Sequence, residues 1–391
     1  MVITTASASA GKHWRINDEV NQLREWASTT IHPLPPPLAG GDKRTIGSSD
    51  TCWLHLQDPK LLVSKQHAQL TYEPPEGWTI TDLQSKNGLF VDGIPRVASS
   101  FMPGAEILIG GVTLVAESPR LCALRDVLSR LIGWSSERRA DVDIALRAVR
   151  MAVALHEPLL LCAEAGHKPI ARLLHRHLIG ADRPFVVCER RKPADKPARK
   201  SPARNAAPAH ATITYERGSA AFAAATGGTL VVQRNRLPED FDQVLKALRA
   251  PTARVLLVVC SQTPPHGLSK QLVVPPLAGR SLELSRIIDE YAADAVAEFG
   301  LGSSLASDDR NWVAQQELTL AQIQTATRRL VVLRAEDGYV NRAAKRLGVA
   351  HGSLSDWLAR RDLPELRGLR DEAGDDDHVG NDDDDHDHDD E

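Results

Sequence analysis

The sequence predicts a multidomain protein with an all-β sandwich, an α/β domain, an all-α helix-turn-helix domain and a disordered acidic tail. Short apolar runs separated by Gly, Pro, Asn and Asp are typical of a sandwich. Apolar strands alternating with amphipathic helices indicate a buried parallel sheet, and two short helices around a glycine turn indicate a helix-turn-helix. We expect a lead-in at residues 1–40, followed by the three domains and the tail at 41–118, 119–315, 316–370 and 371–391.

The lead-in carries two local patterns. Residues 19–27 are expected to form a short helix, and residues 33–37, which hold four prolines around Leu34, are expected to form an extended connector. The first Ala, Ser and Thr residues are followed by a polar stretch, so the sequence predicts no signal peptide.

Between residues 44 and 115, strand-like runs alternate with polar turns. Three polar segments stand out: Arg-Thr-Ile-Gly at 44–47, Val-Ser-Lys-Gln-His at 63–67 and Ser-Lys-Asn-Gly at 85–88. Polar loops carried on a rigid β scaffold are more typical of binding than of catalysis. The strands are expected at 53–56, 68–72, 78–81, 89–91, 107–109 and 112–115.

The order and spacing of these segments resemble the forkhead-associated (FHA) domain, a sandwich that recognises phosphothreonine peptides. The resemblance implies that His67 braces a loop from inside. The family usually places an arginine after its first glycine, but Ser48 follows Gly47 here, which removes a bidentate phosphate contact. A sandwich kept only as a docking module is the alternative. Hydroxyl, ammonium and amide groups suited to a phosphopeptide belong to Ser48, Ser64, Lys65, Ser85, Lys86 and Asn87.

Beyond the sandwich, the apolar positions change their period. Helical spacing over 121–134 and 141–155 precedes an alternation of strands and helices. Seven Lys or Arg residues among Pro and Ala at 190–204 predict a disordered basic loop across 190–210. The strands are expected at 159–163, 184–188, 229–233 and 255–260, and the helices between them at 169–179 and 241–248.

This region resembles the AAA+ module of sigma-54-dependent transcriptional activators. The resemblance rests on Ala-Glu-Ala-Gly-His-Lys at 163–168, Gly-Gly-Thr-Leu at 227–230 and Pro-Pro-Leu-Ala-Gly-Arg at 275–280. It implies a phosphate loop that contains Gly166 and Lys168.

The nucleotide site is degenerate. The loop is about two residues short of the G-x-x-x-x-G-K-[ST] spacing and lacks its second glycine, and Pro169 stands where a magnesium-binding hydroxyl is needed. The strand at 229–233 ends in Gln233 and is followed by Arg234, where metal-holding carboxylates would be needed. We expect no catalytic residues, no enzymatic activity, no metal and no cofactor. ATP binding without turnover, through Gly166 and Lys168, is the alternative to a scaffold or oligomerisation unit.

Near the C-terminal end, three helices are expected. The first covers 319–335; Asn341 caps the second, which stops at Gly348, and the third covers 351–361. The segment Asn-Arg-Ala-Ala-Lys-Arg-Leu-Gly-Val at 341–349 resembles the Fis-type helix-turn-helix that ends sigma-54 activators.

The resemblance implies DNA binding by the last two helices. Trp357 is expected to pack inside the domain, and a dimerisation tip without DNA binding is the alternative. Base edges would be contacted from the start of the last helix, and phosphates by basic side chains. The predicted DNA-binding residues are His351, Gly352, Ser353, Ser355, Arg342, Lys345, Arg360 and Arg361.

Charge and cysteine content limit the partners and the compartment that we expect for the protein. The formal net charge is −4, but the tail alone holds 13 Asp and Glu residues and no Lys or Arg, so the rest has 47 basic against 38 acidic residues. This basic body suggests an anionic partner. No apolar run reaches the roughly 18 residues of a membrane helix. Five scattered cysteines indicate reduced thiols in the cytoplasm.

The combined hypothesis is a bacterial cytoplasmic transcription regulator. It would bind a phosphorylated protein or peptide and DNA, carry a non-hydrolysing core and act as a homo-oligomer without a membrane partner. The acidic tail would compete with DNA for basic surfaces. A phosphopeptide-binding signalling adaptor without DNA binding is the second hypothesis, and an active sigma-54-dependent ATPase is the least favoured.

Overall fold

The computed structural model contains two compact units, Met1–Glu283 with Thr319–Ala321 and Leu284–Leu318 with Gln322–Glu391. The expected basic loop at 190–210, the acidic tail and Arg361 lie outside the described residues. These described residues are 19–35, 43–74, 77–189, 213–215, 217–263, 271–302, 305–316 and 318–360.

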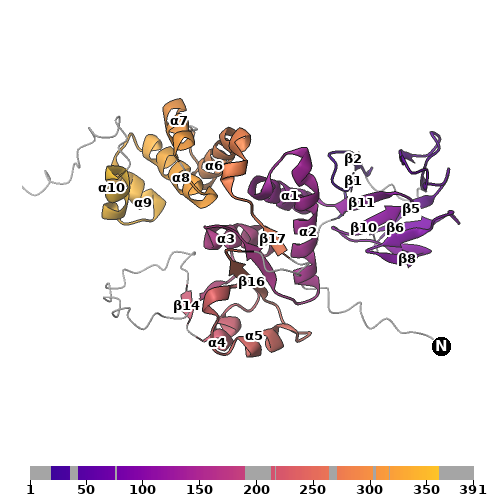
Figure 1. The fold of residues 1–391 in the computed structure, drawn as a ribbon, viewed down its shortest axis with the longest axis horizontal. Coiled ribbons are helices and arrows are strands. Elements are labelled where there is room, and N and C mark those ends of the chain that lie inside the picture. Colours follow the sequence, from indigo (N-terminus) through magenta and orange to yellow (C-terminus); the bar gives the residue numbers. More distant parts are fainter. Residues whose placement is uncertain are drawn as a thin grey trace, which may run out of the picture. The chain divides into compact units, whose positions relative to one another are not determined.

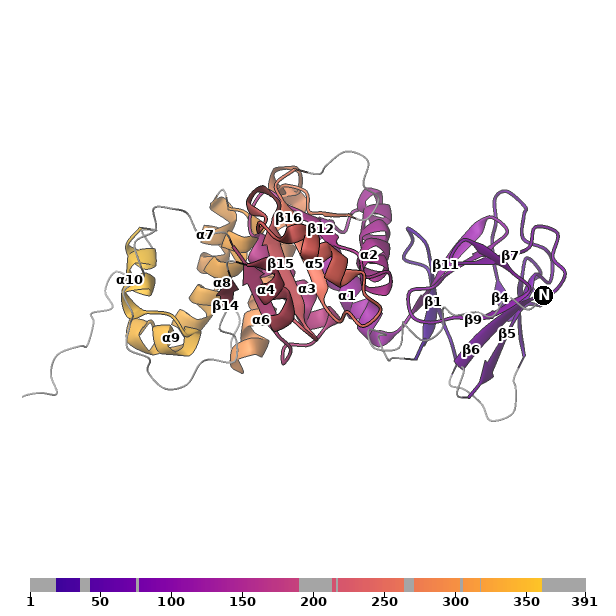
Figure 2. The same cartoon turned by 90° about the horizontal axis from the view of Figure 1, so that it is seen from below.

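The first part of the larger unit is a sandwich of two sheets (Figures 1 and 2). One sheet has the strand order β2-β1-β11-β10-β7-β8 and the other has the order β4-β3-β5-β6-β9. All neighbouring strands are antiparallel except the pair β3 and β4. The strands are β1 (Gln22–Glu25), β2 (Ile31–Pro33), β3 (Arg44–Gly47), β4 (Leu54–His55), β5 (Ala68–Glu73), β6 (Gly77–Asp82), β7 (Leu89–Val91), β8 (Ile94–Arg96), β9 (Ala98–Ser100), β10 (Glu106–Ile109) and β11 (Val112–Glu117).

Apolar side chains from alternate strand positions fill the space between the two sheets. Ile46, Leu70 and Ile80 of one sheet and Ile107 and Leu114 of the other are fully buried within one cluster. The predicted all-β sandwich is therefore confirmed.

The start of the sandwich differs from the sequence prediction. The short helix expected over residues 19–27 is wrong, because Gln22–Glu25 pairs with β11 in the register Gln22↔Glu117 and with β2 on its other side. Leu23 is fully buried in the sandwich core. Pairing with a strand about ninety residues away overrides the weak local preference for a helix. The sandwich thus includes residues that were expected in the lead-in.

The rest of the larger unit is an α/β region around one parallel sheet of order β14-β13-β15-β16-β12-β17. The buried, mainly parallel sheet is confirmed. Its elements are α1 (Pro119–Ile132), α2 (Arg139–Ala154), β12 (Leu159–Cys162), α3 (His167–Leu178), β13 (Phe185–Cys188), β14 (Ile213–Tyr215), α4 (Gly218–Ala224), β15 (Thr229–Gln233), α5 (Phe241–Leu248), β16 (Leu256–Ser261) and β17 (Gln271–Val273).

Helices cover both faces of this sheet, as a parallel sheet requires. Ala221 of α4 and Val244 of α5 belong to one core cluster with Leu230 and Val232 of β15. On the other face, His175 of α3 lies 2.9 Å from the Thr229 hydroxyl.

The smaller unit is helical. Its elements are α6 (Leu284–Phe299), α7 (Ser307–Gln315), α8 (Leu320–Ala335), α9 (Val340–Leu347) and α10 (His351–Ala359), with the start of α8 assigned to the larger unit. This unit joins α6 and α7 to the last three helices, and the expected domain boundary at 315 stays a prediction.

The last two helices surround a tight turn. Gly348 adopts φ +69° at the end of α9, as predicted for its C-terminal stop. Tyr339, not Asn341, occupies the N-cap position, so the predicted cap is wrong; Asn341 is exposed within α9. Ala343, Leu347 and Leu354 are buried on the facing sides of the two helices.

No helix among the described residues is both long enough and apolar enough to cross a lipid bilayer.

Candidate functional site

Gly47 brings two loops of the sandwich into contact at the end of β3. The amide of Ser48 donates to the Ser64 carbonyl at 3.0 Å, and that of Ser49 donates to the Lys65 carbonyl at 3.1 Å. A Cβ atom on Gly47 would lie 2.2 Å from the Lys65 carbonyl oxygen. Only glycine therefore permits this close approach of the two backbones.

His67 braces the second loop from inside, as predicted, and it also links that loop to the third. Its side chain is fully buried. The Ser64 amide donates to Nδ1 at 3.0 Å, so the ring proton lies on Nε2, which donates to the Gly88 carbonyl at 3.1 Å. One neutral imidazole thus fixes both loops.

The third loop is held by short side chains. Gly88 adopts φ +73°, a conformation that glycine adopts at little cost. Ser85 Oγ accepts from the Gly88 amide at 3.0 Å, and Ser64 Oγ accepts from the Lys86 amide at 3.1 Å. Because both hydroxyls are already hydrogen-bonded, the loop geometry is set before any ligand binds.

Asn87 has a contact that the sequence did not predict. Its Nδ2 donates to the Leu62 carbonyl at 2.7 Å. The side chain therefore ties the third loop to the second, and its predicted part in phosphopeptide binding stays a prediction.

Asp58 organises the second loop and was missed from the sequence. Its carboxylate accepts from the amides of Lys60, Leu62 and Gly111 at 3.0, 2.8 and 3.0 Å. Burial alone would raise the pKa of Asp58, but these amides hold it below its ordinary value. The Asp58-Pro59 dipeptide is a turn signal that could have identified it.

The surface formed by these three loops, 48–53, 56–67 and 83–88, is called the recognition surface below. Ser48, Lys65 and Lys86 are exposed on it. A hollow of about 570 Å³ lies beside Ser48, lined also by His55 and Leu61. Two exposed ammonium groups on loops of fixed geometry suit an anionic group.

Arg44 does not replace the arginine that the sequence lacks after Gly47. Its guanidinium lies over the Trp53 ring, 5.5 Å from the ring centroid. Arg44 stands at the opposite end of β3 from Gly47.

The predicted phosphate loop lies between β12 and α3. Gly166 adopts φ +76° just before the helix. His167 Nε2 lies 2.8 Å from the Ser261 carbonyl at the end of β16. Lys168 pairs with Glu189 at 2.5 Å. The polar groups of this loop thus contact the chain itself.

The cysteines of the parallel sheet are buried thiols. Burial raises the pKa of Cys260 to about 12 and that of Cys188 to about 11. All five cysteines are free. A thiol with so high a pKa is a poor nucleophile. Within the described ranges, no three His, Cys, Asp or Glu side chains are grouped so as to hold a metal.

The predicted DNA-binding residues lie on the surface of α9 and α10. Arg342, Lys345 and Arg360 are exposed, as are Gly352 and Ser353. Each candidate within this part of the described chain therefore remains accessible.

Two other candidates have contacts within their own helix, and Trp357 is packed. Ser355 Oγ lies 3.4 Å from His351 Nε2. Trp357 is 7% exposed and meets the Trp312 ring edge-on at 6.2 Å. The predicted packing role of Trp357 is confirmed.

Comparisons with known proteins identify one domain. The sequence model of the FHA domain family matches residues 44–110, and no curated protein matches the chain significantly. The solved FHA domain of the CT664 protein from Chlamydia trachomatis is 23% identical, covers 24% of this chain and 92% of its own, and has a TM-score of 0.21. EmbR of Mycobacterium tuberculosis with a low-affinity phosphopeptide is 24% identical over 25% of this chain and 24% of its own, with a TM-score of 0.22.

A further solved structure is the N-terminal FHA domain of Rad53p from S. cerevisiae in complex with a phosphothreonine peptide. It is 18% identical, covers 25% of this chain and 91% of its own, and has a TM-score of 0.23. The family match spans the Gly47 turn, the His67 brace and the Gly88 turn. Residues 44–110 of this chain therefore form an FHA domain.

Proposed function

We propose that this protein is a bacterial cytoplasmic transcription regulator. Its FHA domain binds a phosphothreonine-containing partner, its α9–α10 pair binds DNA, and its α/β region acts as a scaffold that does not hydrolyse nucleotide. The observation that carries the proposal is the recognition surface, whose loops match the FHA family and are braced through His67.

Phosphate binding at the recognition surface follows from its chemistry. Lys65 and Lys86 supply ammonium groups, and Ser48 supplies a hydroxyl where the family usually has arginine. A lysine ammonium is a point charge and does not bind a phosphate through two parallel hydrogen bonds, as an arginine guanidinium does. We therefore expect binding that is weaker and more sensitive to salt than in an arginine-bearing FHA domain.

The test is a calorimetric titration of the full chain with phosphothreonine peptides and their unphosphorylated counterparts. A selected phosphopeptide binds, and its counterpart does not. The double variant Lys65→Ala/Lys86→Ala loses the preference. Lys43→Ala is the matched control, because Lys43 precedes β3 at the end away from Gly47. Equal binding of both peptide forms would refute the phosphate-specific function.

DNA binding is supported by the exposed basic side chains of α9 and the small residues that begin α10. Arg342, Lys345 and Arg360 are exposed at positions suited to phosphate contacts. Arg342 lies over the Tyr339 ring and Arg360 lies 3.9 Å from Asp356, so a phosphate would compete with these exposed contacts. Gly352 and Ser353 allow close approach to base edges. Arg346 is less available, since it pairs with Glu336 at 2.5 Å and donates to the Phe299 carbonyl.

Selection of genomic fragments by the purified full chain tests this part. Salt-sensitive binding that is lost in Arg342→Ala/Lys345→Ala supports the regulator, whereas Lys246→Ala on α5 serves as the control. Phosphopeptide binding without any DNA selection would instead favour the signalling adaptor.

The scaffold role of the α/β region is supported by the contacts of the β12–α3 loop. Lys168 forms an ion pair with Glu189, and His167 contacts the end of β16. Nucleotide phosphates would have to lie beside that strand end. Magnesium-dependent phosphate release from ATP by the full chain, lost in Lys168→Ala, would overturn this part of the proposal.

A further inference from the structure

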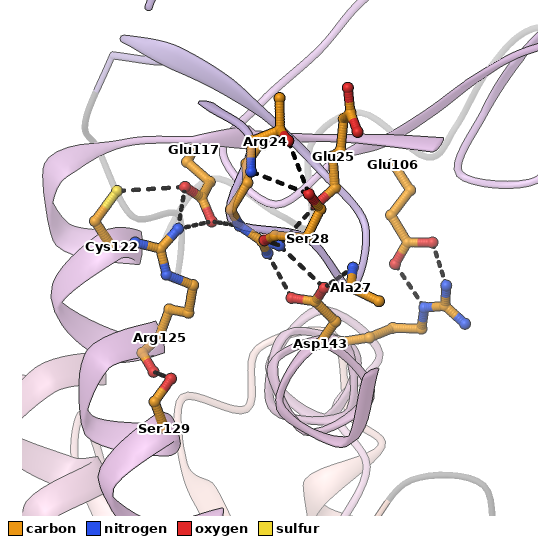
Figure 3. Close-up of polar contacts among 12 residues, drawn as sticks. Arg24, Glu25, Ala27, Ser28, Glu106, Glu117, Cys122, Arg125, Ser129 and Asp143 are labelled. Atoms are coloured by element: carbon orange, nitrogen blue, oxygen red, sulfur yellow. Dashed lines mark hydrogen bonds and ion pairs between the residues drawn. The ribbon is translucent and has the colours of Figure 1, made fainter. Parts of the chain in front are cut away.

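A buried charged network joins the sandwich to α1 and α2. Arg24 of β1 and Glu117 of β11 come from the sandwich, Asp143 from α2 and Arg125 from α1 (Figure 3). Arg24, Glu117 and Asp143 are 3%, 0% and 2% exposed. Buried charges are costly to desolvate unless every group is paired. A network so deeply buried therefore demands one geometry.

Arg24 uses its whole guanidinium in this network. Nε donates to Glu117 at 2.8 Å, and the two terminal nitrogens donate to the Asp143 oxygens at 3.1 and 2.5 Å. Burial alone would lower the pKa of Arg24, but the Asp143 and Glu117 carboxylates raise it above its ordinary value. The bidentate pair with Asp143 fixes the angle between β1 and α2.

The Glu117 and Asp143 carboxylates each accept further hydrogen bonds besides those from Arg24. Arg125 donates to both oxygens of Glu117 at 2.8 and 2.7 Å, and Gln22 donates to Glu117 at 2.8 Å. Asp143 also accepts from the Ala27 amide at 2.7 Å, in the turn between β1 and β2. Arg24 and Glu117 thus have partners in both the sandwich and the helices, and Asp143 of α2 is paired entirely with groups of the sandwich.

The contact continues along one face of α2. Asp143, Arg147 and Arg150 are spaced by four and three residues, so they lie on the same side of the helix. Arg147 pairs bidentately with Glu106 at the start of β10 and lies 4.4 Å from the Trp26 ring centroid.

Arg150 extends this contact to a further part of the sandwich. It pairs with Asp92, after β7, at 2.9 Å. Successive turns of α2 therefore contact three separate parts of the sandwich: the β1–β2 turn, the start of β10 and the β7–β8 turn.

We propose that this contact is a fixed joint that holds the FHA domain in one orientation on α1 and α2. The joint comprises the buried network and the two α2 pairs, Arg147–Glu106 and Arg150–Asp92. It makes the FHA domain and the α/β region one rigid body, rather than two modules on a linker. Domains that meet through small, polar contacts usually move independently. In this joint the buried charges would lose their partners if the domains moved, and this opposes such motion.

The joint lies at the end of the sandwich opposite the recognition surface. β7 begins after Gly88 of the third loop and ends before Asp92 of the joint. β10 begins at Glu106 of the joint and leads to Gly111, whose amide binds Asp58. The recognition surface stays open while the joint is closed. A bound partner is thereby carried in a fixed position relative to the parallel sheet.

Pulsed electron spin distance measurement on the full chain tests the joint. Spin labels are attached at Glu73→Cys on β5 and Gln243→Cys on α5, both exposed positions. Labelling is selective, because four native cysteines are buried and the pKa of half-buried Cys122 is raised to about 11 by burial and Glu117. No phosphopeptide is needed, so the outcome is independent of the proposed ligand.

A single narrow distance distribution is expected with the joint intact. Asp143→Ala should broaden it on the order of twofold, because Arg24 loses its bidentate partner. Arg138→Ala is the control, since Arg138 pairs with Asp141 at the start of α2 and not with the sandwich. Should Asp143→Ala fail to fold, Arg147→Ala/Arg150→Ala removes only the outer pairs and should also broaden the distribution. A broad distribution in the intact joint, or no broadening in any folded variant, overturns the proposal.

Discussion

The loops of the recognition surface and the β12–α3 loop all carry polar side chains at strand ends. They differ in whether their lysine side chains are exposed or paired within the chain. At the recognition surface, the inward contacts are made by His67, Asp58 and serine hydroxyls, while Lys65 and Lys86 remain exposed. At the β12–α3 loop, Lys168 pairs with Glu189 and His167 contacts Ser261.

This difference separates a surface prepared for a ligand from one satisfied by its own chain. The first surface has its geometry fixed by groups that a ligand would not need. The second uses the groups that a nucleotide would need for internal contacts. The comparison can be tested by removing a matched group from each region.

The largest effect is expected from His67→Ala. The Ser64 amide and the Gly88 carbonyl lose their partner in a buried site, which should destabilise the FHA domain by roughly 3 kcal/mol. Calorimetric melting of the full chain measures the loss. His55→Ala is the exposed control and should change stability by no more than about 0.5 kcal/mol. Equal effects of the two substitutions would show that the brace is unimportant.

A smaller difference is expected between two glycines. Gly47→Ala forces a Cβ atom against the Lys65 carbonyl and should lower the free energy of unfolding by about 2 kcal/mol. The variant should also lose phosphopeptide binding. Gly166→Ala, at φ +76° and with its new Cβ atom 2.5 Å from the Ala321 Cβ, should also cost about 2 kcal/mol, from strain and overlap together. It should leave phosphopeptide binding unchanged, which is the difference between the two glycines. Melting and peptide titration of both variants measure this. Retained phosphopeptide binding in a folded Gly47→Ala protein would contradict the close-approach account.

Two lysines sharpen the comparison at the level of binding. Lys86→Ala should weaken phosphopeptide binding about tenfold, because a charge-assisted contact is lost. Lys168→Ala removes an ion pair that is about half exposed and should leave peptide and DNA affinity unchanged. Calorimetric titration measures both, with Lys246→Ala as an exposed control. A nucleotide-dependent change in DNA affinity that Lys168→Ala abolishes would remove the distinction between the regions.

The smallest effect is expected from acid. The folded-state pKa of Asp58 is lowered, so its contribution to stability is present above its unfolded pKa and is lost as pH falls through the folded value. The melting temperature of the FHA domain should therefore decrease when the pH is lowered below about 4. Asp58→Asn should flatten this dependence, as followed by melting across a pH series. An unchanged pH dependence in the variant would assign the effect to other carboxylates.

Much of the fold was predictable because it depends on local periodicity. The strands at 89–91 and 229–233 and the helix at 241–248 have the predicted bounds. The bracing role of His67 was implied by the resemblance to FHA domains, and the family match confirms that domain.

The remaining features depend on partners far away in the chain. β1 forms because it pairs with β11, and no local pattern in Gln22–Glu25 reveals that partner. Asp58 binds Gly111, and Arg24 binds Asp143, through contacts set by tertiary packing. The bond from Asn87 to Leu62 likewise depends on how two loops meet. DNA binding and the inactive nucleotide site stay predictions.

A crystal structure of the full chain grown with a selected phosphothreonine peptide, ATP and magnesium tests the central claim most directly. We expect a phosphate group beside Lys65 and Lys86 and no nucleotide beside Lys168. A metal-bridged triphosphate beside Lys168, with the Glu189 pair broken and the recognition surface empty, would contradict it.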